Sequence, residues 1–178
     1  MRNAIEAGVL FESALAHYEE PMPIQLLERW VEALRSGKYG QVRERLRYED
    51  SYCCLGVLCD VIEPQGWEEE DGDELAYRFV PRAVFGEDPE WVDVELPNQY
   101  RAMTRLDEDM LVLLMKANDG VFEFDTRSGS DFIVGRIPQV TFDEIASLLE
   151  QLQAVALCEV TTDEAKAAFI QSVVAEEE

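Results

Sequence analysis

The chain has 178 residues, 47% of them hydrophobic, and a formal net charge of −23. This length suits a single domain, residues 1–178, that buries a core, and the hydrophobic content excludes a disordered polyelectrolyte. The acid excess argues against direct binding of nucleic acid or of an anionic membrane, because both would repel the chain. It permits basic partners, divalent cations or simply high solubility.

The N-terminal residues carry no export signal, since Glu6 and Glu12 stand where a signal peptide has its apolar region. The longest apolar run, MLVLLM, is far shorter than the roughly 18 residues that cross a bilayer. We therefore expect a cytoplasmic protein with reduced cysteines and no membrane partner.

Helical spacing of apolar residues predicts a first helix over residues 3–18, within an N-terminal helical extension at 1–20. The run EEPMP ends it, because proline cannot continue a helix. A second helix begins at Ile24, with Gly37 placed as its C-cap. The following VRERLRY, residues 42–48, fits either an extended link or a helical turn.

The stretch SYCCLGVLCDV contains three of the four cysteines and predicts a helix over Cys53–Ile62. Its apolar residues fill an arc of about 200°, which is typical of a buried central helix. Ser51 is the predicted N-cap. Gly56 lowers helix propensity, so we expect a neighbouring element to approach closely there.

An acidic, loop-rich segment follows at residues 63–95, with one short strand at LAYRFV. The sequence LDEDMLVLLMKANDG predicts a helix capped by Asp107. VFEFD and DFIVGRI predict a β-hairpin with a long turn. Thr141 and Glu144 form a capping box for the helix TFDEIASLLEQLQAVAL.

A last helix begins at Thr161 or Thr162, within a C-terminal helical extension at 159–178 whose end frays. Together these elements predict a mainly α, or α+β, fold. We expect a compact helical domain with a central, buried, cysteine-containing helix and one or two small β-hairpins.

The cysteines favour packing over chemistry. Their spacing on one helix does not converge on zinc, and Cys54 and Cys59 diverge too far for a disulfide. Cys53 remains a candidate nucleophile because a helix N-terminus lowers the pKa of a thiol. However, His17 is the chain's one histidine, and no motif partners it. We expect buried thiols, with no metal and no cofactor.

The run WVEALRSGKYGQVRERLRYEDSYCCLGVLCDV resembles the opening of small uncharacterised phage and prophage proteins. The later LMKANDG and TFDEIASLLE resemble their Asn-Asp-Gly turn and Phe-x-Glu-Ile-Ala helix. The resemblance covers residues 28–62 and 111–150. In those proteins the turn runs almost directly into the helix, whereas VFEFDTRSGSDFIVGRIPQV intervenes here. The resemblance implies a phage origin, hence the host cytoplasm, and it carries over no catalytic residue.

The acid excess is concentrated in the middle of the chain, where residues 51–100 contain 13 acidic and 2 basic residues. There are three explanations for this concentration: a solvated loop, a calcium loop, or a surface that imitates nucleic acid. The order of ligands that an EF-hand calcium loop requires is absent. For the third, two tryptophans provide candidate anchors, since aromatic residues dominate interface hot spots. The predicted interaction surface comprises Trp67, Glu68, Glu69, Glu70, Asp71, Asp73, Glu74, Glu87, Asp88, Glu90, Trp91 and Asp93.

These features favour a non-enzymatic phage-type protein that binds and inhibits a basic, nucleic-acid-handling host protein, such as a restriction or CRISPR effector, with DNA mimicry as one mode of inhibition. One alternative is a small enzyme or ligand-binding module built around Cys53 and the series Arg43, Arg45 and Arg47. Internal ion pairing of those arginines is the simpler explanation. Another alternative is a structural or regulatory subunit of a phage or host complex.

Overall fold

The computed structural model describes residues 3–70, 72–81, 92, 95–128 and 131–174, without the side chains of 73–74, 123–128 and 131–136. Its helices are α1 (Ala4–Leu15), α2 (Ile24–Arg35), α3 (Cys54–Ile62), α4 (Asn98–Thr104), α5 (Glu108–Asp119), α6 (Phe142–Ala156) and α7 (Thr162–Val173). Its strands are β1 (Gly40–Gln41), β2 (Arg47–Tyr48), β3 (Ser51–Tyr52), β4 (Trp67–Glu70), β5 (Asp73–Phe79), β6 (Phe122–Ser128) and β7 (Asp131–Ile137).

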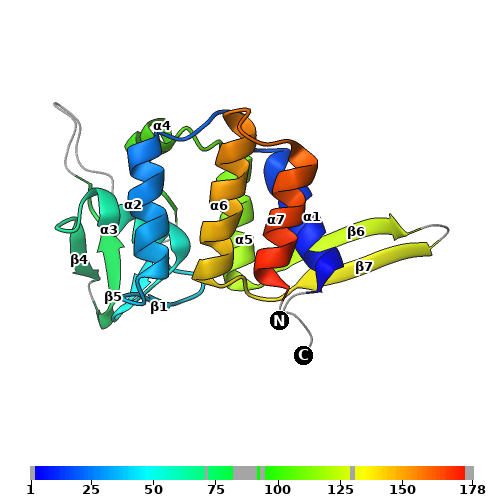
Figure 1. Ribbon diagram of the computed structural model, residues 1–178. Coiled ribbons are helices and arrows are strands. Elements are labelled where there is room, and N and C mark those ends of the chain that lie inside the picture. The colour runs from blue at the N-terminus through cyan, green and yellow to red at the C-terminus, as the bar shows by residue number, and fades with distance from the viewer. Residues whose placement is uncertain (1–2, 71, 82–91, 93–94, 129–130, 175–178) are drawn as a thin grey trace.

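The fold is α+β, because the described residues form seven helices together with a five-stranded mixed sheet and a two-stranded hairpin. Helices α2, α6, α7 and α1 pack side by side as a row (Figure 1). Helix α3 packs against α2 and α5 beside a small sheet at one end of this row. The hairpin of β6 and β7 projects from the opposite end. No helix within the described ranges is long and apolar enough to cross a membrane.

The small sheet has the strand order β1-β3-β2-β5-β4, in which only the β1–β3 pair is parallel among those that the structure describes. Within the segment predicted to be loop-rich, residues 63–95, β4 is a strand that was not expected, and it forms a hairpin with β5. In that hairpin Trp67 pairs with Phe79 and Glu69 with Tyr77. Pairing with aromatic partners therefore outweighs the weak strand propensity of an acidic run.

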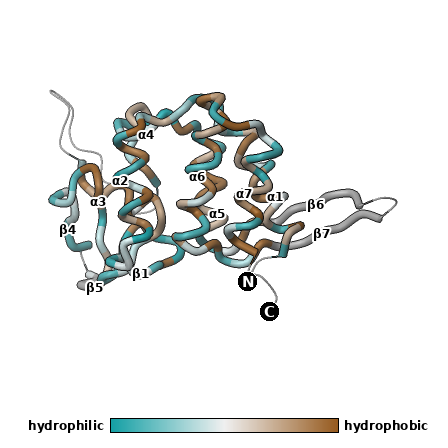
Figure 2. The backbone as a smooth tube through the Cα atoms, in the orientation of Figure 1, coloured by the Kyte–Doolittle hydropathy of each residue, from teal (hydrophilic) through white to brown (hydrophobic). Residues whose placement is uncertain are grey.

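Helix α3 begins one residue later than expected, and its N-cap is Cys53 rather than Ser51. The Sγ atom of Cys53 accepts a hydrogen bond from the Gly56 N–H at 3.3 Å, whereas Ser51 lies in β3. Residues 54–60 are all buried, and α3 is largely apolar in Figure 2. A Cβ atom on Gly56 would lie 1.9 Å from the Leu46 carbonyl oxygen, which confirms the predicted close approach.

The predicted caps Asp107 and Thr141 are confirmed, whereas the C-cap of α2 is Ser36 rather than Gly37. Asp107 accepts from the Met110 N–H at 2.6 Å, and Thr141 and Glu144 form the capping box of α6. Thr161 caps α7, which settles where that helix begins.

The predicted hairpin is confirmed, but the long turn was wrong, because β6 runs to Ser128 and β7 begins at Asp131. In the stretch 42–48, residues 43–46 form bends and Arg47 and Tyr48 form β2, so the stretch is neither a helical turn nor extended throughout. Helix α4 was not predicted.

Candidate functional site

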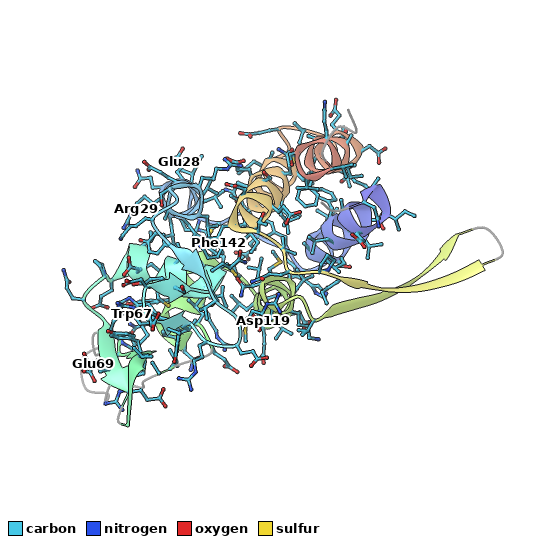
Figure 3. The ribbon with its side chains drawn as sticks, turned by 90° about the horizontal axis from the view of Figure 1, so that it is seen from below. Glu28, Arg29, Trp67, Glu69, Asp119 and Phe142 are labelled. Atoms are coloured by element: carbon cyan, nitrogen blue, oxygen red, sulfur yellow. The ribbon has the colours of Figure 1, made fainter. Side chains whose placement is uncertain are left out.

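The predicted acidic surface is described only at Trp67, Glu68, Glu69 and Glu70, on β4. Two of these carboxylates pair with arginines, Glu68 with Arg78 at 3.3 Å and Glu70 with Arg45 at 2.6 Å. Glu69 is exposed at the outer side of the sheet (Figure 3). Asp73 and Glu74 lie in β5 without described side chains, and the remaining predicted residues lie outside the described ranges: Asp71, Glu87, Asp88, Glu90, Trp91 and Asp93.

Trp67 is half-buried and is engaged within the molecule. Its indole N–H donates to Oδ1 of the buried Asp60 at 3.1 Å, and its ring meets Tyr52 and Phe79 edge to face. Asp60 also accepts from the Tyr39 hydroxyl at 2.7 Å. This network ties the sheet to α3, so Trp67 has a structural role in addition to any contact with a partner.

The three arginines of the Arg43, Arg45 and Arg47 series have separate partners. Arg43 donates to the Gln139 side chain, and Arg45 pairs with Glu70. The Arg47 guanidinium lies 3.9 Å from the centre of the Tyr77 ring. Internal ion pairing is therefore confirmed for Arg45 alone, and its partner comes from β4 rather than from the neighbouring acids. The series does not form one phosphate-binding cluster.

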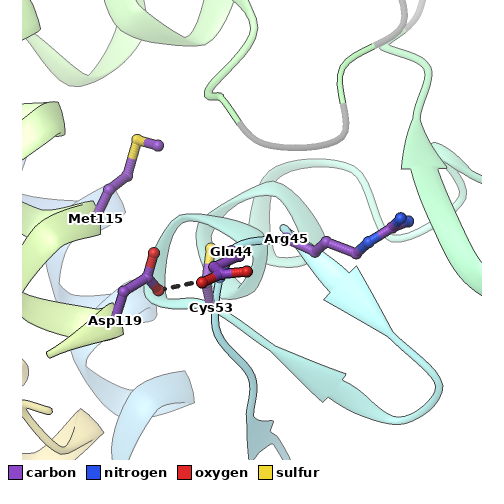
Figure 4. Close-up of a pocket in the computed structure, with 5 residues that line it drawn as sticks. All are labelled: Glu44, Arg45, Cys53, Met115 and Asp119. Atoms are coloured by element: carbon purple, nitrogen blue, oxygen red, sulfur yellow. Dashed lines mark hydrogen bonds between the residues drawn. The ribbon is translucent and has the colours of Figure 1, made fainter. Parts of the chain in front are cut away.

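Cys53 lines a small hollow of about 10 Å³ together with Glu44, Arg45, Met115 and Asp119 (Figure 4). Burial raises the pKa of the Cys53 thiol to about 12, so desolvation outweighs the effect of the helix N-terminus. The thiol is thus protonated at neutral pH and is a poor nucleophile.

The other two cysteines of α3, Cys54 and Cys59, are also buried, and burial raises the pKa of both thiols well above the ordinary value. Cys158 is exposed. Within the described part of the chain, no group of three or more His, Cys, Asp or Glu side chains could hold a metal ion.

A different acidic surface lies along one side of the helical row, where helix ends and connections meet at the top in Figure 1. It combines the α1–α2 connection, the start of α5, and the α6–α7 connection with the start of α7. All eight acidic residues of these segments are exposed. We call them the acidic end: Glu19, Glu20, Asp107, Glu108, Asp109, Glu159, Asp163 and Glu164.

The α1–α2 connection is held in place by Gln153 of α6. Its Oε1 accepts from the Tyr18 hydroxyl at 2.6 Å and from the Met22 N–H at 2.9 Å, and its Nε2 donates to the Met22 carbonyl at 2.8 Å. Arg105 donates to the Pro21 carbonyl at 3.2 Å, which adds a second anchor and places one cation near this end. The backbone that carries Glu19 and Glu20 is therefore fixed from both sides.

The acids at the starts of α5 and α7 also stabilise those helices, because a helix N-terminus carries partial positive charge. Asp107 caps α5, and Glu164 completes the capping box of α7 with Thr161. The Thr161 N–H bonds the carboxylate of Glu164 and lowers its pKa. Glu164 is thus ionised at neutral pH.

Sequence reasoning missed the acidic end because its residues come from three segments that span more than a hundred positions of the chain. The count by segment directed attention to residues 51–100, where acids are consecutive. A signal was nevertheless present, since the predicted caps put acidic first turns at the starts of α5 and α7. Their position at a common end follows from helix packing, which the counts did not contain.

A second missed feature is the buried Asn118 at the end of α5. Its Oδ1 accepts from the Gln41 side chain at 2.9 Å and from the Cys54 N–H at 3.3 Å, and its Nδ2 donates to the Val42 carbonyl at 2.8 Å. Asn118 therefore joins α5, α3 and the segment after β1. Its role is structural.

Comparison with known proteins gives one family. A family model described as a domain of unknown function (DUF8296) matches residues 22–153, about three quarters of the chain. The chain belongs to the DUF8296 family. No curated protein and no solved structure matches it.

The DUF8296 match covers α2 to most of α6, including the sheet and the β6–β7 hairpin. It leaves out α1 and α7, which pack against each other. Of the acidic end, Asp107, Glu108 and Asp109 lie inside the match, whereas the acids of the two connections lie outside it. The acidic end is thus assembled from the DUF8296 domain and its flanking segments.

Proposed function

We propose that the protein is an acidic accessory protein of phage type that binds a basic, nucleic-acid-handling host protein and blocks its nucleic-acid site. Anti-restriction or anti-CRISPR inhibition by DNA mimicry is the form of this proposal that the phage resemblance favours. A net charge of −23 would draw the protein to a basic cleft and repel nucleic acid itself.

The observation that supports the proposal most is the distribution of ion pairs. Basic residues form ion pairs at several places: Arg35, Lys38, Arg45, Arg78, Arg101 and Lys166 each pair with a carboxylate elsewhere in the structure. At the acidic end, the ion pair among the described residues is that of His17 with Asp109, at 3.8 Å. Apart from Asp109 and the helix-capping Asp107 and Glu164, the carboxylates of this end have no ion-pair partner among the described residues and so remain available to a partner's cations.

Rigidity is the second support. Charged side chains on a fixed backbone lose less conformational entropy on binding than those on a flexible loop. The contacts of Gln153 and Arg105 fix the α1–α2 connection, and the caps fix the starts of α5 and α7. In this proposal the buried α3 is the central helix of the fold. The contact surface extends from the acidic end to Glu69 and to the other acidic residues of the predicted interaction surface in 68–93.

The alternative built around Cys53 and the three arginines receives no support from the geometry. The Cys53 thiol is buried with a raised pKa, and the guanidinium groups lie apart with separate partners. The alternative of a structural subunit has no specific observation in its favour.

Capture from a bacterial host lysate tests the proposal. We expect the immobilised protein to retain a basic protein at about 50 mM salt and to release it at about 200 mM or on addition of duplex DNA, because charge-led association is screened. A triple variant of the acidic end, Glu19→Gln, Glu20→Gln and Glu159→Gln, should retain much less.

The matched control neutralises three exposed carboxylates that lie outside both the acidic end and residues 68–93: Glu28→Gln, Glu32→Gln and Asp143→Asn. It has the same net charge as the triple variant, so a partner that binds the acidic end should distinguish the two. Retention that neither salt nor DNA reduces, or that both variants lose equally, would contradict the proposal.

A further inference from the structure

The β6–β7 hairpin is an arm that extends away from the helical body (Figures 1 and 3). At its base Ile137 is buried and Phe122 packs against the core. Beyond the base, the register pairs the two strands with each other as far as Ser128 and Asp131. Among the described residues, no further strand joins this two-stranded sheet, so β6 and β7 each have an open edge.

Such an arm lacks what normally stabilises a sheet. A two-stranded hairpin is marginal in water, and three or more strands with an apolar face are needed for independent stability. Positions of one sheet face along this register include Phe122, Phe124, Ile133 and Ile137. An open edge next to apolar positions is a template for pairing with another strand.

The charge of the arm indicates the kind of strand that fits. Residues 122–137 contain three acidic residues and two arginines, a net charge of −1, whereas the whole chain carries −23. A basic partner would therefore find little attraction here. A second copy of this chain, which is repelled by every acidic surface of the body, meets almost no repulsion at the arm.

The order of charges along β6 is self-complementary. In an antiparallel pair of two β6 strands centred on Thr126, Asp125 stands opposite Arg127 of the second copy, and Arg127 opposite its Asp125. Thr126 then faces its own equivalent. Opposite charges and Thr–Thr pairs are both favourable cross-strand neighbours.

We propose that β6 pairs in this way with β6 of a second copy, so that the two arms form a four-stranded antiparallel sheet and the protein is a dimer. In this register, Phe122 of one copy and Phe122 of the second copy, which mark the bases of the two arms, lie eight residues apart, or about 27 Å along the strands. This distance exceeds the Debye length of about 8 Å at physiological salt, so the two acidic bodies are largely screened from each other. The inference does not depend on the proposed function.

A charge swap tests this pairing, with mass measured by light scattering over a concentration series. We expect the wild type to be a dimer and the single variants Arg127→Asp and Asp125→Arg to be monomers, because each places like charges opposite each other. The double variant Asp125→Arg, Arg127→Asp restores both pairs and keeps the wild-type net charge, so it should be a dimer again.

Thermal melting of each variant confirms that the body remains folded. The pairing is overturned if the wild type is a monomer at every concentration. It is equally overturned if the single variants dimerise as well as the wild type, or if the double variant stays monomeric while folded.

Discussion

At the scale of single residues, the cysteine stretch is explained by packing. Gly56 is required because the Leu46 carbonyl occupies the space of a side chain, and Cys53 caps α3 with its sulfur. The sequence predicted the close approach at Gly56 and the burial of the thiols. It did not predict the cap, because Ser51 is the stronger capping residue and only the pairing of β3 removes it from that position.

Replacing Gly56 with Ala should destabilise the protein by about 2 kcal/mol or more, because the added methyl group meets a backbone carbonyl that cannot rotate away. The gain in helix propensity, about 1 kcal/mol, is smaller. Urea unfolding measures the change. Gly37→Ala is the control, since no atom lies near its Cβ position and it should lose only about 1 kcal/mol through its φ of 68°. Equal losses would contradict the explanation.

Thiol labelling of the native protein should modify Cys158 and leave Cys53, Cys54 and Cys59 unmodified at pH 8. The reason is that burial blocks access and raises the pKa of all three thiols, that of Cys53 to about 12. Mass spectrometry after iodoacetamide treatment measures the pattern, with the unfolded protein as the control in which all four react. Labelling of native Cys53 as fast as Cys158 would revive the nucleophile hypothesis.

At the scale of elements, local signals predicted most of the helices. Asp107 and Thr141 cap their helices as predicted, because a cap depends on a few neighbouring residues. The strand β4 and the helix α4 were missed. The acidic run of β4 becomes a strand only through its pairing with β5, and α4 is a short helix with no side-chain cap.

Gln153→Ala should lower the free energy of unfolding by about 3 kcal/mol, because it removes the acceptor of the Tyr18 hydroxyl and the donor to the Met22 carbonyl and leaves the Met22 N–H only its longer bond to the Tyr18 hydroxyl, at 3.3 Å. Hydrogen exchange at the Met22 amide should accelerate as well. Gln151→Ala on the same helix is the matched control and should do neither. This substitution leaves the net charge unchanged. Weaker binding of a partner by the variant would therefore show that binding depends on where Glu19 and Glu20 are held, and not only on how many acidic residues are present.

Unchanged exchange at Met22 in the Gln153→Ala variant would show that the α1–α2 connection is held by something else. In that case Arg105, which donates to the Pro21 carbonyl, is the remaining anchor that the structure describes. The rigidity argument for the acidic end would then rest on that contact alone.

At the scale of the whole molecule, charge is the dominant property. Composition alone predicted that the chain avoids nucleic acid, but the segment counts located the surface among residues 51–100. The structure pairs Glu68 and Glu70 of that region with arginines, and it gathers other acids from three distant segments at one end of the helices. Tertiary packing decides which carboxylates are neutralised, so no count along the chain could find the acidic end.

The most direct test of the central claim is the salt dependence of binding to a purified partner that DNA displaces. For the wild type, we expect the dissociation constant to rise at least tenfold between about 50 and 200 mM salt. For the variant Glu19→Gln, Glu20→Gln, Glu159→Gln, binding should be weaker and its dependence on salt shallower. Equal affinity and equal salt dependence for the two proteins would contradict the account.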